Sequence, residues 1–422
     1  MLTRHPPLGL LPRRRPQQTR SITVDGEGPN RPREGRLIPK PEVPCYPVHN
    51  DLRLLTAGRG ADNGDQDKGL FGIGPAFFTT AGKTALAWAF RASGLQPGAA
   101  VLLPAYHCLA MVEPLPWLGL KPVFYRLHED LSIDYAALEA RLDERCKALV
   151  AVHYFGFPQD GPRLREFCTQ HGLSLIEDCA HSFFGHRGEE RLGSFGDFAI
   201  GSLPKFFPVG SGGCLVSARR PLPPEPLAAP GSLADLRSLV RDLQTTHYYG
   251  RLRPLGPITT GTAALLKALS LLGLGRDMAG LRDTPASLDY GAGRMGGTIQ
   301  RACNPGEIAA RRRENYRTIC QALAGQPGIN PVKPELEEGI VPYMVPLRIP
   351  ALRRVFAQLE DRAVPMQRFG QFLSTELDDA LCPVSSDLSH HGLQLPCHQS
   401  LLPEEIQWMI DRLCEICAAG RG

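Results

Sequence analysis

The sequence has no long hydrophobic run and no large excess of charge of one sign. The best candidate for a membrane helix, residues 262–275, is shorter than the ~20 apolar residues that such a helix needs, and it contains Lys267. The chain carries 47 basic and 43 acidic side chains, and its net charge of +4 gives no electrostatic case for nucleic acid or an anionic membrane. These absences predict a soluble protein that binds neither nucleic acids nor membranes.

Dense, regularly spaced cysteines, a secretory signal and internal repeats are also lacking. Twelve cysteines are scattered over 422 residues, and the apolar stretch at residues 8–12 is too short for a signal peptide. We therefore expect a cytoplasmic protein with mostly buried free thiols. Residues 1–44 are rich in proline and arginine and are expected to form a flexible tail.

From about Gly72 onwards, helical and strand patterns alternate with short connections. Strands are expected at residues 100–103, 122–125, 148–155, 173–177 and 214–217, and helices at 83–93, 109–117, 134–142 and 161–171. This alternation predicts an α/β domain with a mainly parallel sheet, in which ligands bind at the carboxyl ends of the strands.

The second half of the chain has a weaker pattern. A proline-rich linker is expected at residues 221–230, helices at 233–274, 307–323 and 404–417, and an apolar segment at 340–349. We predict a large α/β domain over residues 45–235, a helical insertion over 236–290 and a small α+β C-terminal domain over 291–422.

An acidic strand end is the first candidate for chemistry. The strand that ends in Glu177 and Asp178 is followed by His181. An acid at this end of a strand lies where α/β proteins bind ligands, although structural capping explains such an acid about equally well.

Lys205 is the second candidate. It follows Ser202 in the run Ser-Leu-Pro-Lys and precedes two phenylalanines and a glycine-rich stretch. Apolar burial lowers a lysine's pKa from about 10.4, and lysines so activated form covalent imines with carbonyl compounds. An ordinary surface lysine in a turn is the alternative.

The third candidate is an anion site at the start of a helix. Gly82 permits a close backbone approach, the amides of the first helical turn are unpaired, and Lys83 and Thr84 could add a charge and a hydroxyl. The segment lacks the glycine spacing of a P-loop, and helix capping is the simpler explanation when the segment is taken alone.

Taken together and in this order, these segments resemble the DegT/DnrJ/StrS-type sugar aminotransferases, a family of fold-type-I pyridoxal-phosphate enzymes. The resemblance is clear from about Gly72 to Ser217. The segments that carry it are Ala81-Gly82-Lys83-Thr84, Leu103-Pro104-Ala105-Tyr106-His107, Val152-His153-Tyr154-Phe155-Gly156, Glu177-Asp178-Cys179-Ala180-His181, and Gly193 to Asp197.

The resemblance implies a role for each candidate residue. Lys205 would bind pyridoxal 5′-phosphate covalently and shuttle a proton, and Asp178 would pair with the protonated pyridine nitrogen. His181 would lie near the phenolic oxygen of the cofactor. The remaining cofactor-binding residues would be Gly82, Lys83, Thr84 and Ser202 at the phosphate, and Tyr106 or His107 stacked on the ring.

The sequence departs from the family pattern at a few positions. Lys83 replaces the usual threonine, Cys108 stands where a stacking aromatic residue often lies, and Ser202 is only three residues before the lysine. Residues 221–285 fit the family poorly.

The resemblance implies a fold-type-I transferase that works as a homodimer. It would move an amino group from an amino acid, such as glutamate, to a keto acceptor. The acceptor would be a nucleotide-linked keto sugar used for polysaccharide or secondary-metabolite biosynthesis. The alternatives are a sugar dehydratase on the same scaffold and a cofactor-binding paralogue without turnover.

Four other features have plainer explanations. Cys414 and Cys417 are expected to pack within a helix, and residues 390–391 and 311–313 to be solvated surface. The segment at residues 397–398 could lie on the substrate side, but packing is the more frequent role of such residues.

Overall fold

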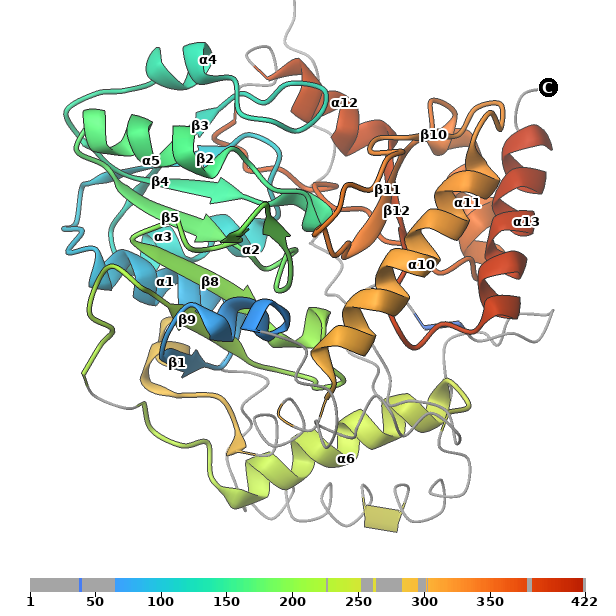
Figure 1. Ribbon diagram of the computed structural model, residues 1–422, viewed down its shortest axis with the longest axis horizontal. Helices are drawn as coiled ribbons and strands as arrows, with labels where there is room; N and C mark the ends of the chain where they lie inside the picture. The colour runs from blue at the N-terminus through green and yellow to red at the C-terminus, as the bar shows by residue number, and fades with distance from the viewer. Residues whose placement is uncertain are drawn as a thin grey trace, which may run out of the picture. The chain divides into compact units, whose positions relative to one another are not determined.

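The computed structural model describes residues 38–39, 65–224, 227–251, 261–262, 283–294, 301, 303–377 and 382–419. Within these residues, the strands form a seven-stranded sheet, a three-stranded sheet and a two-stranded hairpin (Figure 1). No helix among the described residues is both long enough and apolar enough to span a bilayer.

The large sheet has the strand order β1-β9-β8-β5-β4-β2-β3. Its strands are β1 (Ala76–Thr79), β2 (Ala100–Pro104), β3 (Lys121–Tyr125), β4 (Cys146–Val152), β5 (Ser174–Asp178), β8 (Phe198–Ser202) and β9 (Gly213–Val216). Neighbouring strands from β3 to β8 are parallel, whereas β9 is antiparallel to both β8 and β1. The predicted α/β fold with a mainly parallel sheet is confirmed.

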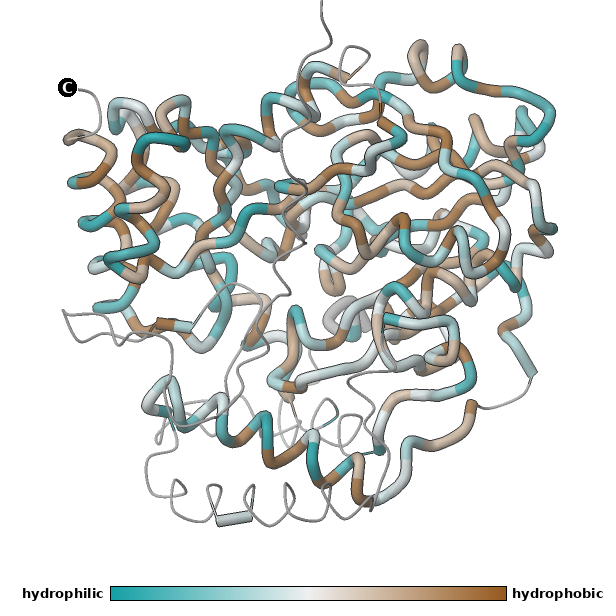
Figure 2. Tube along the Cα trace, turned by 180° about the vertical axis from the view of Figure 1, so that it is seen from behind, coloured by the Kyte–Doolittle hydropathy of each residue, from teal (hydrophilic) through white to brown (hydrophobic). Residues whose placement is uncertain are grey.

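The carboxyl ends of β2, β4, β5 and β8 consequently lie along one edge of this sheet. All residues of β2 and nearly all of β4 and β8 are buried, as expected for parallel strands covered on both faces. Figure 2 shows hydrophobic stretches running through this layer, with hydrophilic residues gathered in the surrounding segments.

Helices and 3₁₀ turns cover the sheets and connect the strands. They are η2 (Asp65–Gly72), α1 (Gly82–Ala92), α2 (Leu109–Val112), α3 (Pro114–Trp117), α4 (Tyr135–Glu139), η3 (Tyr154–Gly156), α5 (Gly161–Gln170), η4 (Leu203–Lys205), α6 (Ser232–Tyr248), η6 (Pro285–Asp289), α10 (Pro305–Leu323), α11 (Leu352–Asp361), α12 (Pro383–His391) and α13 (Pro403–Ala419). Helix α1 packs on β1, β8 and β9, and α5 packs on β5.

Side-chain caps explain where several helices begin. Asp160 accepts a hydrogen bond from the Arg163 amide at the start of α5, and Asn304 accepts one from the Glu307 amide at the start of α10. Each cap satisfies an amide that the helix itself leaves unpaired.

The smaller sheet belongs to the C-terminal part of the chain. It consists of β10 (Asn330–Pro331), β11 (Met344–Arg348) and β12 (Gly392–Pro396), all antiparallel. Helix α13 packs against α10 and α11 beside this sheet. The hairpin of β6 (His186–Arg187) and β7 (Glu190–Arg191) lies between β5 and β8 in the sequence.

Most of the expected elements are present, with shifted ends. The expected helix at 109–117 is two four-residue helices, and the helix at 134–142 ends at Glu139. The expected strand at 148–155 leaves the sheet after Val152. The sequence pattern did not predict β1 or β8.

The expected helices at residues 233–274 are only partly described. Helix α6 accounts for the first of them, and residues 252–260 and 263–282 lie outside the described part of the chain. The predicted boundary at residue 235 falls inside α6, which is continuous from Ser232 to Tyr248.

Of the predicted tail at residues 1–44, only Ile38 and Pro39 are described. Ile38 is buried in the hydrophobic core, and the Pro39 carbonyl lies 3.4 Å from His398 Nε2.

Candidate active site

The parallel strands bring three of the predicted site residues to one edge of the large sheet. Asp178 is the last residue of β5, and Ser202 is the last residue of β8. Lys205 ends the 3₁₀ turn η4 directly after Ser202. Residues separated in the sequence are thus neighbours because strands β5 and β8 are paired in parallel.

Asp178 is a buried carboxylate with a free oxygen. The amide of Ala180 donates a hydrogen bond of 2.9 Å to Oδ1, and among the described residues no donor reaches Oδ2. Burial raises the pKa of Asp178, while the Ala180 amide and the charges of Lys205 and His153 oppose that rise. Such a carboxylate is suited to a cationic ligand group that restores its lost solvation.

Lys205 lies in the same electrostatic environment. Its Nζ is 5.4 Å from the centre of the Tyr343 ring. Its charge contributes to the pKa shifts of both Asp178 and His181. The amine therefore lies close enough to the carboxylate and the imidazole to act on both electrostatically.

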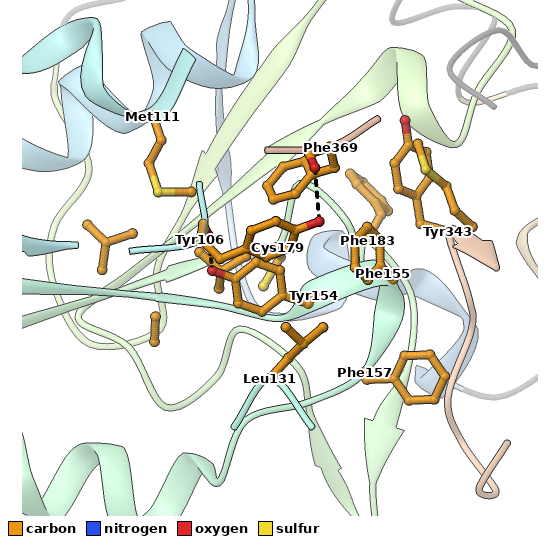
Figure 3. Packing of buried hydrophobic residues seen from close by; sticks show 14 of the residues in the cluster. Tyr106, Met111, Leu131, Tyr154, Phe155, Phe157, Cys179, Phe183, Tyr343 and Phe369 are labelled. Carbon is orange, nitrogen blue, oxygen red and sulfur yellow. Dashed lines mark hydrogen bonds between the residues drawn. The ribbon is translucent and has the colours of Figure 1, made fainter. Parts of the chain in front are cut away.

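His181 is held between aromatic rings. Phe155 stacks on the imidazole at 5.5 Å and 19°, and the rings of Tyr343 and Phe369 lie at 4.9 Å (Figure 3 labels these three aromatic residues). Burial, followed by the Lys205 charge, lowers the pKa of His181 well below its ordinary value. The Phe155 amide points at Nδ1 from 3.5 Å, which assigns the proton of the neutral ring to Nε2.

A narrow cradle lies at the start of α1. A Cβ atom on Gly82 would meet the Cβ of Ser202 at 3.3 Å, and one on Gly213 would meet the Ala81 carbonyl oxygen at 2.3 Å. Ala81 makes no side-chain cap, and among the described residues no acceptor takes the first-turn amides of Gly82, Lys83 and Thr84. Free amides at a helix N-terminus beside a serine hydroxyl favour an anion.

Lys83 and Thr84 direct their side chains elsewhere. The Lys83 ammonium donates to Glu113 at 2.6 Å and to Asp283. Burial alone would lower the pKa of Lys83, but these two hydrogen bonds outweigh it and raise the pKa. The Thr84 hydroxyl is fully buried against Thr80 at 3.2 Å, so both residues offer the cradle their amides only.

Tyr106 is fixed in the core rather than directed to the site. Its hydroxyl donates to the Phe369 carbonyl at 2.9 Å, and its ring stacks on Tyr154 (Figure 3).

His107 is likewise committed to packing. Its Nδ1 donates to the Ala105 carbonyl at 2.9 Å, its Nε2 accepts from the Ser374 amide, and its ring stacks on Phe124 at 4.8 Å and 12°. Both ring nitrogens and one ring face of His107 are therefore occupied by contacts other than Lys205.

Cys108 is the member of this segment that faces the site. Burial raises the pKa of its thiol, and the charges of Lys205 and Asp178 act on it as well. The position where the family often has a stacking aromatic residue is thus occupied here by a small thiol.

Glu177, the neighbour of Asp178, has a structural role. Its carboxylate accepts hydrogen bonds from His153 Nε2 at 2.8 Å and from the amides of Gly193 and Gly196. The Gln159 amide donates to His153 Nδ1, which places the imidazole proton on Nε2. Glu177 thereby anchors the glycine loop that leads into β8.

The expectation that residues 311–313 are all solvated is wrong for Arg312. Its side chain is fully buried, whereas Arg311 and Arg313 remain partly exposed. The guanidinium reaches the Lys205 carbonyl at 2.8 Å and the Gln399 side chain at 2.9 Å. One signal could have revealed this burial, because Arg312 falls on the helical face of Ile308 and Tyr316.

The other minor expectations have mixed outcomes. Cys417 is buried in the core, which confirms packing for that residue. His398 is fully buried and bonded to Ser400 Oγ at 2.8 Å. His390 is exposed, as expected.

The chain shares its fold with proteins of known structure. It superposes on Streptomyces venezuelae DesV, solved with a ketimine intermediate, with a TM-score of 0.57 and 21% identity over 81% of this chain and 84% of that chain. A putative sugar aminotransferase from Streptococcus pneumoniae in its PMP form gives 0.61 and 16% over 90% of this chain and 100% of that chain.

A sequence comparison with family models matches part of the chain. Residues 70–221 match the DegT/DnrJ/EryC1/StrS aminotransferase family, which confirms the resemblance over this part of the chain.

Two curated relatives match parts of the chain. The UDP-N-acetyl-3-dehydro-alpha-D-glucosamine 3-aminotransferase of Acidithiobacillus ferrooxidans is 31% identical over 40% of this chain. The GDP-perosamine synthase of Vibrio cholerae is 34% identical over 32% of this chain. The matches span 47% and 38% of the lengths of these two relatives.

Proposed function

We propose that the chain is a pyridoxal-phosphate-dependent aminotransferase that transfers an amino group from glutamate to a nucleotide-linked keto sugar. The observation that carries the proposal is the convergence of Lys205 and the buried Asp178 at one sheet edge, beside the free amides of α1. The names of the two curated relatives, an aminotransferase acting on a UDP-linked keto sugar and a GDP-perosamine synthase, support a nucleotide-linked sugar as the acceptor.

The residues present fit the cofactor. Asp178 is buried and has an oxygen that no donor among the described residues reaches, which suits a protonated pyridine nitrogen, and the amides of Gly82 and Lys83 with the Ser202 hydroxyl suit a phosphate. When bound, pyridoxal phosphate supplies an aldehyde that condenses with amines and a ring that accepts electron density.

Each side chain then has a defined task. Lys205 would hold the cofactor through its ε-amine and would carry a proton at the α-carbon of the substrate. Asp178 would pair with the protonated ring nitrogen, and a hydrogen bond to a charged group is worth roughly 1.5–3 kcal/mol. His181, neutral and protonated at Nε2, would donate a hydrogen bond to the phenolic oxygen.

Reductive trapping of the cofactor tests the proposal. Purified protein is incubated with pyridoxal phosphate and reduced with borohydride, and the modified peptide is identified by mass spectrometry. We expect the label on Lys205, its loss in Lys205→Ala, and its retention in the control Lys147→Ala, which removes an exposed lysine. Labelling spread over surface lysines would refute the assignment of Lys205.

Turnover measurements distinguish the proposed aminotransferase from the two alternatives, a sugar dehydratase and a cofactor-binding paralogue without turnover. Glutamate should convert the bound cofactor to its amine form, a nucleotide-linked keto sugar should convert it back, and Asp178→Asn should slow both conversions at least about tenfold. A labelled Lys205 without conversion by any amino acid would favour a non-catalytic paralogue. A deoxygenated sugar product without an added amine would favour a dehydratase.

We also propose that two copies of the chain associate through the face that carries Leu109 and Phe372. These apolar side chains are 43% and 64% exposed, and Leu109 borders a groove of about 410 Å³ between α2, α3 and β3. Leu109 directly follows Cys108, on which the charges of Lys205 and Asp178 act. Phe372 lies two residues before Ser374, whose amide donates to His107. Sedimentation should give a dimer for the wild type and a monomer for the Leu109→Ser/Phe372→Ser variant; an unchanged mass would refute this interface.

A further inference from the structure

The 3₁₀ turn that carries Lys205 is held from the C-terminal part of the chain. Arg312, on α10, is fully buried, and its guanidinium lies over the Phe206 ring at 4.4 Å. Its Nη2 donates to the Lys205 carbonyl at 2.8 Å, and its Nε donates to Gln399 Oε1 at 2.9 Å.

Gln399 completes a two-point attachment. Its Nε2 donates to the Phe206 carbonyl at 2.7 Å while its Oε1 accepts from Arg312. Two consecutive carbonyls, those of Lys205 and Phe206, are therefore bonded by two side chains that are bonded to each other.

The remaining donors of Arg312 extend the attachment to β11. Its Nη1 reaches the carbonyls of Pro342 and Tyr343 at 3.3 and 3.2 Å. Because the Tyr343 ring lies beneath the Lys205 ammonium, the same guanidinium fixes the backbone on both sides of the amine.

The partners of Arg312 distinguish it from a simple ion-pair anchor. Among the described residues its hydrogen-bond partners are carbonyl and amide oxygens and not carboxylates, and burial lowers its pKa to about 10, so it remains a cation at neutral pH. Four of its five N–H groups can be assigned to the carbonyl and amide oxygens named above. This leaves little capacity to receive a substrate carboxylate, and it points to a role exerted through the Lys205 turn.

We propose that Arg312 and Gln399 are positioning residues, which fix the backbone of the Lys205 turn and thereby aim the amine across Tyr343 towards Asp178. This inference deepens the proposed function, because the amine matters only if it captures a carbonyl compound. Without the two side chains, the turn would keep its local 3₁₀ hydrogen bonds but lose the contacts that orient it.

A matched buried arginine provides the control. Arg251 is also buried, and it donates to the Ser400 carbonyl at 3.0 Å and to the Glu405 carboxylate, but it does not contact the Lys205 turn. Arg251→Met therefore removes a buried arginine that, unlike Arg312, is paired with a carboxylate, and it reports on destabilisation that does not act through a bond to the Lys205 turn.

The first experiment uses the cofactor-free protein and hydrogen exchange. We expect Arg312→Met and Gln399→Glu to speed exchange at the amides of Phe206, Phe207 and Val209 at least about tenfold, as the loss of a buried hydrogen bond to a charged group implies. Arg251→Met should leave these amides unchanged. Gln399→Glu keeps an acceptor for Arg312 but replaces the donor to the Phe206 carbonyl with an anionic oxygen, so it acts on the attachment at Phe206. Equal protection in all four proteins would overturn the proposal.

The second experiment measures how fast pyridoxal phosphate becomes trapped on Lys205 by borohydride. Arg312→Met should slow trapping at least about tenfold, and Arg312→Lys, which can reach one carbonyl, should recover part of the rate. Normal trapping in Arg312→Met would also overturn the proposal. If the wild type traps no cofactor, the proposed function fails, while the exchange result still decides whether the turn is held in this way.

Discussion

His107 offers a quantitative test of which residue in its segment belongs to the site. Burial lowers the pKa of this imidazole from 6.5 to about 4, although its hydrogen bonds to the Ala105 and Pro104 carbonyls oppose the shift. An unfolded chain binds a proton at His107 below pH 6.5, and the folded chain does so only near pH 4. His107 therefore stabilises the fold fully above pH 6.5, and this contribution is lost as the pH falls towards 4.

The size of the effect follows from these two pKa values. Lowering the pH from 7.5 to 5 should remove roughly 2 kcal/mol of unfolding free energy through His107 alone. His107→Gln has no such titration, so urea unfolding at the two pH values should show a smaller pH-dependent loss in this variant by about that amount. The control is His390→Gln, which removes an exposed histidine.

The same variant separates packing from cofactor binding. His107→Gln should retain the wild-type affinity for pyridoxal phosphate at pH 7.5, since the ring lies against Phe124. An identical pH dependence of stability in His107→Gln and the wild type would refute the packing argument, and a large loss of cofactor affinity would return His107 to the site.

Two further substitutions test the anion cradle. Gly213→Ala would set a Cβ 2.3 Å from the Ala81 carbonyl oxygen, so α1 must shift. We expect the free energy of unfolding to fall by about 1–3 kcal/mol and calorimetry to show at least tenfold weaker binding of a phosphate ester. The control is Gly261→Ala, whose Cβ would meet no atom of the described residues within 4 Å. Lys83→Met should leave pyridoxal phosphate affinity within about threefold, because the ammonium is bonded to Glu113 and Asp283 and the helix amides remain. A tenfold loss in Lys83→Met would show that the ammonium turns towards the ligand.

Two of the candidate site residues could be placed because they stand at a strand end and a helix start. Asp178 ends a predicted apolar strand and Gly82 opens a predicted helix, whereas Ser202 was singled out by the run Ser-Leu-Pro-Lys and not by a predicted strand. The parallel order of the strands then brought them together, as the rule for α/β sheets requires.

The orientation of individual side chains could not be predicted in the same way. Tyr106, His107 and Cys108 are consecutive, and only tertiary contacts decide that the first two pack against Phe369 and Phe124. Strand β8 was missed because its short apolar stretch lies among glycines and polar residues.

Arg312 illustrates the same limit. A run of three arginines in a helix is typical of a solvated surface, and its burial depends on carbonyls that the chain supplies elsewhere, at Lys205 and Tyr343.

The contact between Lys205 and Arg312 also has a consequence for synthesis on the ribosome, which releases the chain in sequence order. The strand that carries Asp178 and the 3₁₀ turn that carries Lys205 emerge well before α10, and Gln399 emerges later still. A nascent chain interrupted before α10 thus has the amine and the carboxylate but lacks the side chains that hold the lysine turn. Maturation of this centre is accordingly a late event, coupled to the folding of the last helices to be translated.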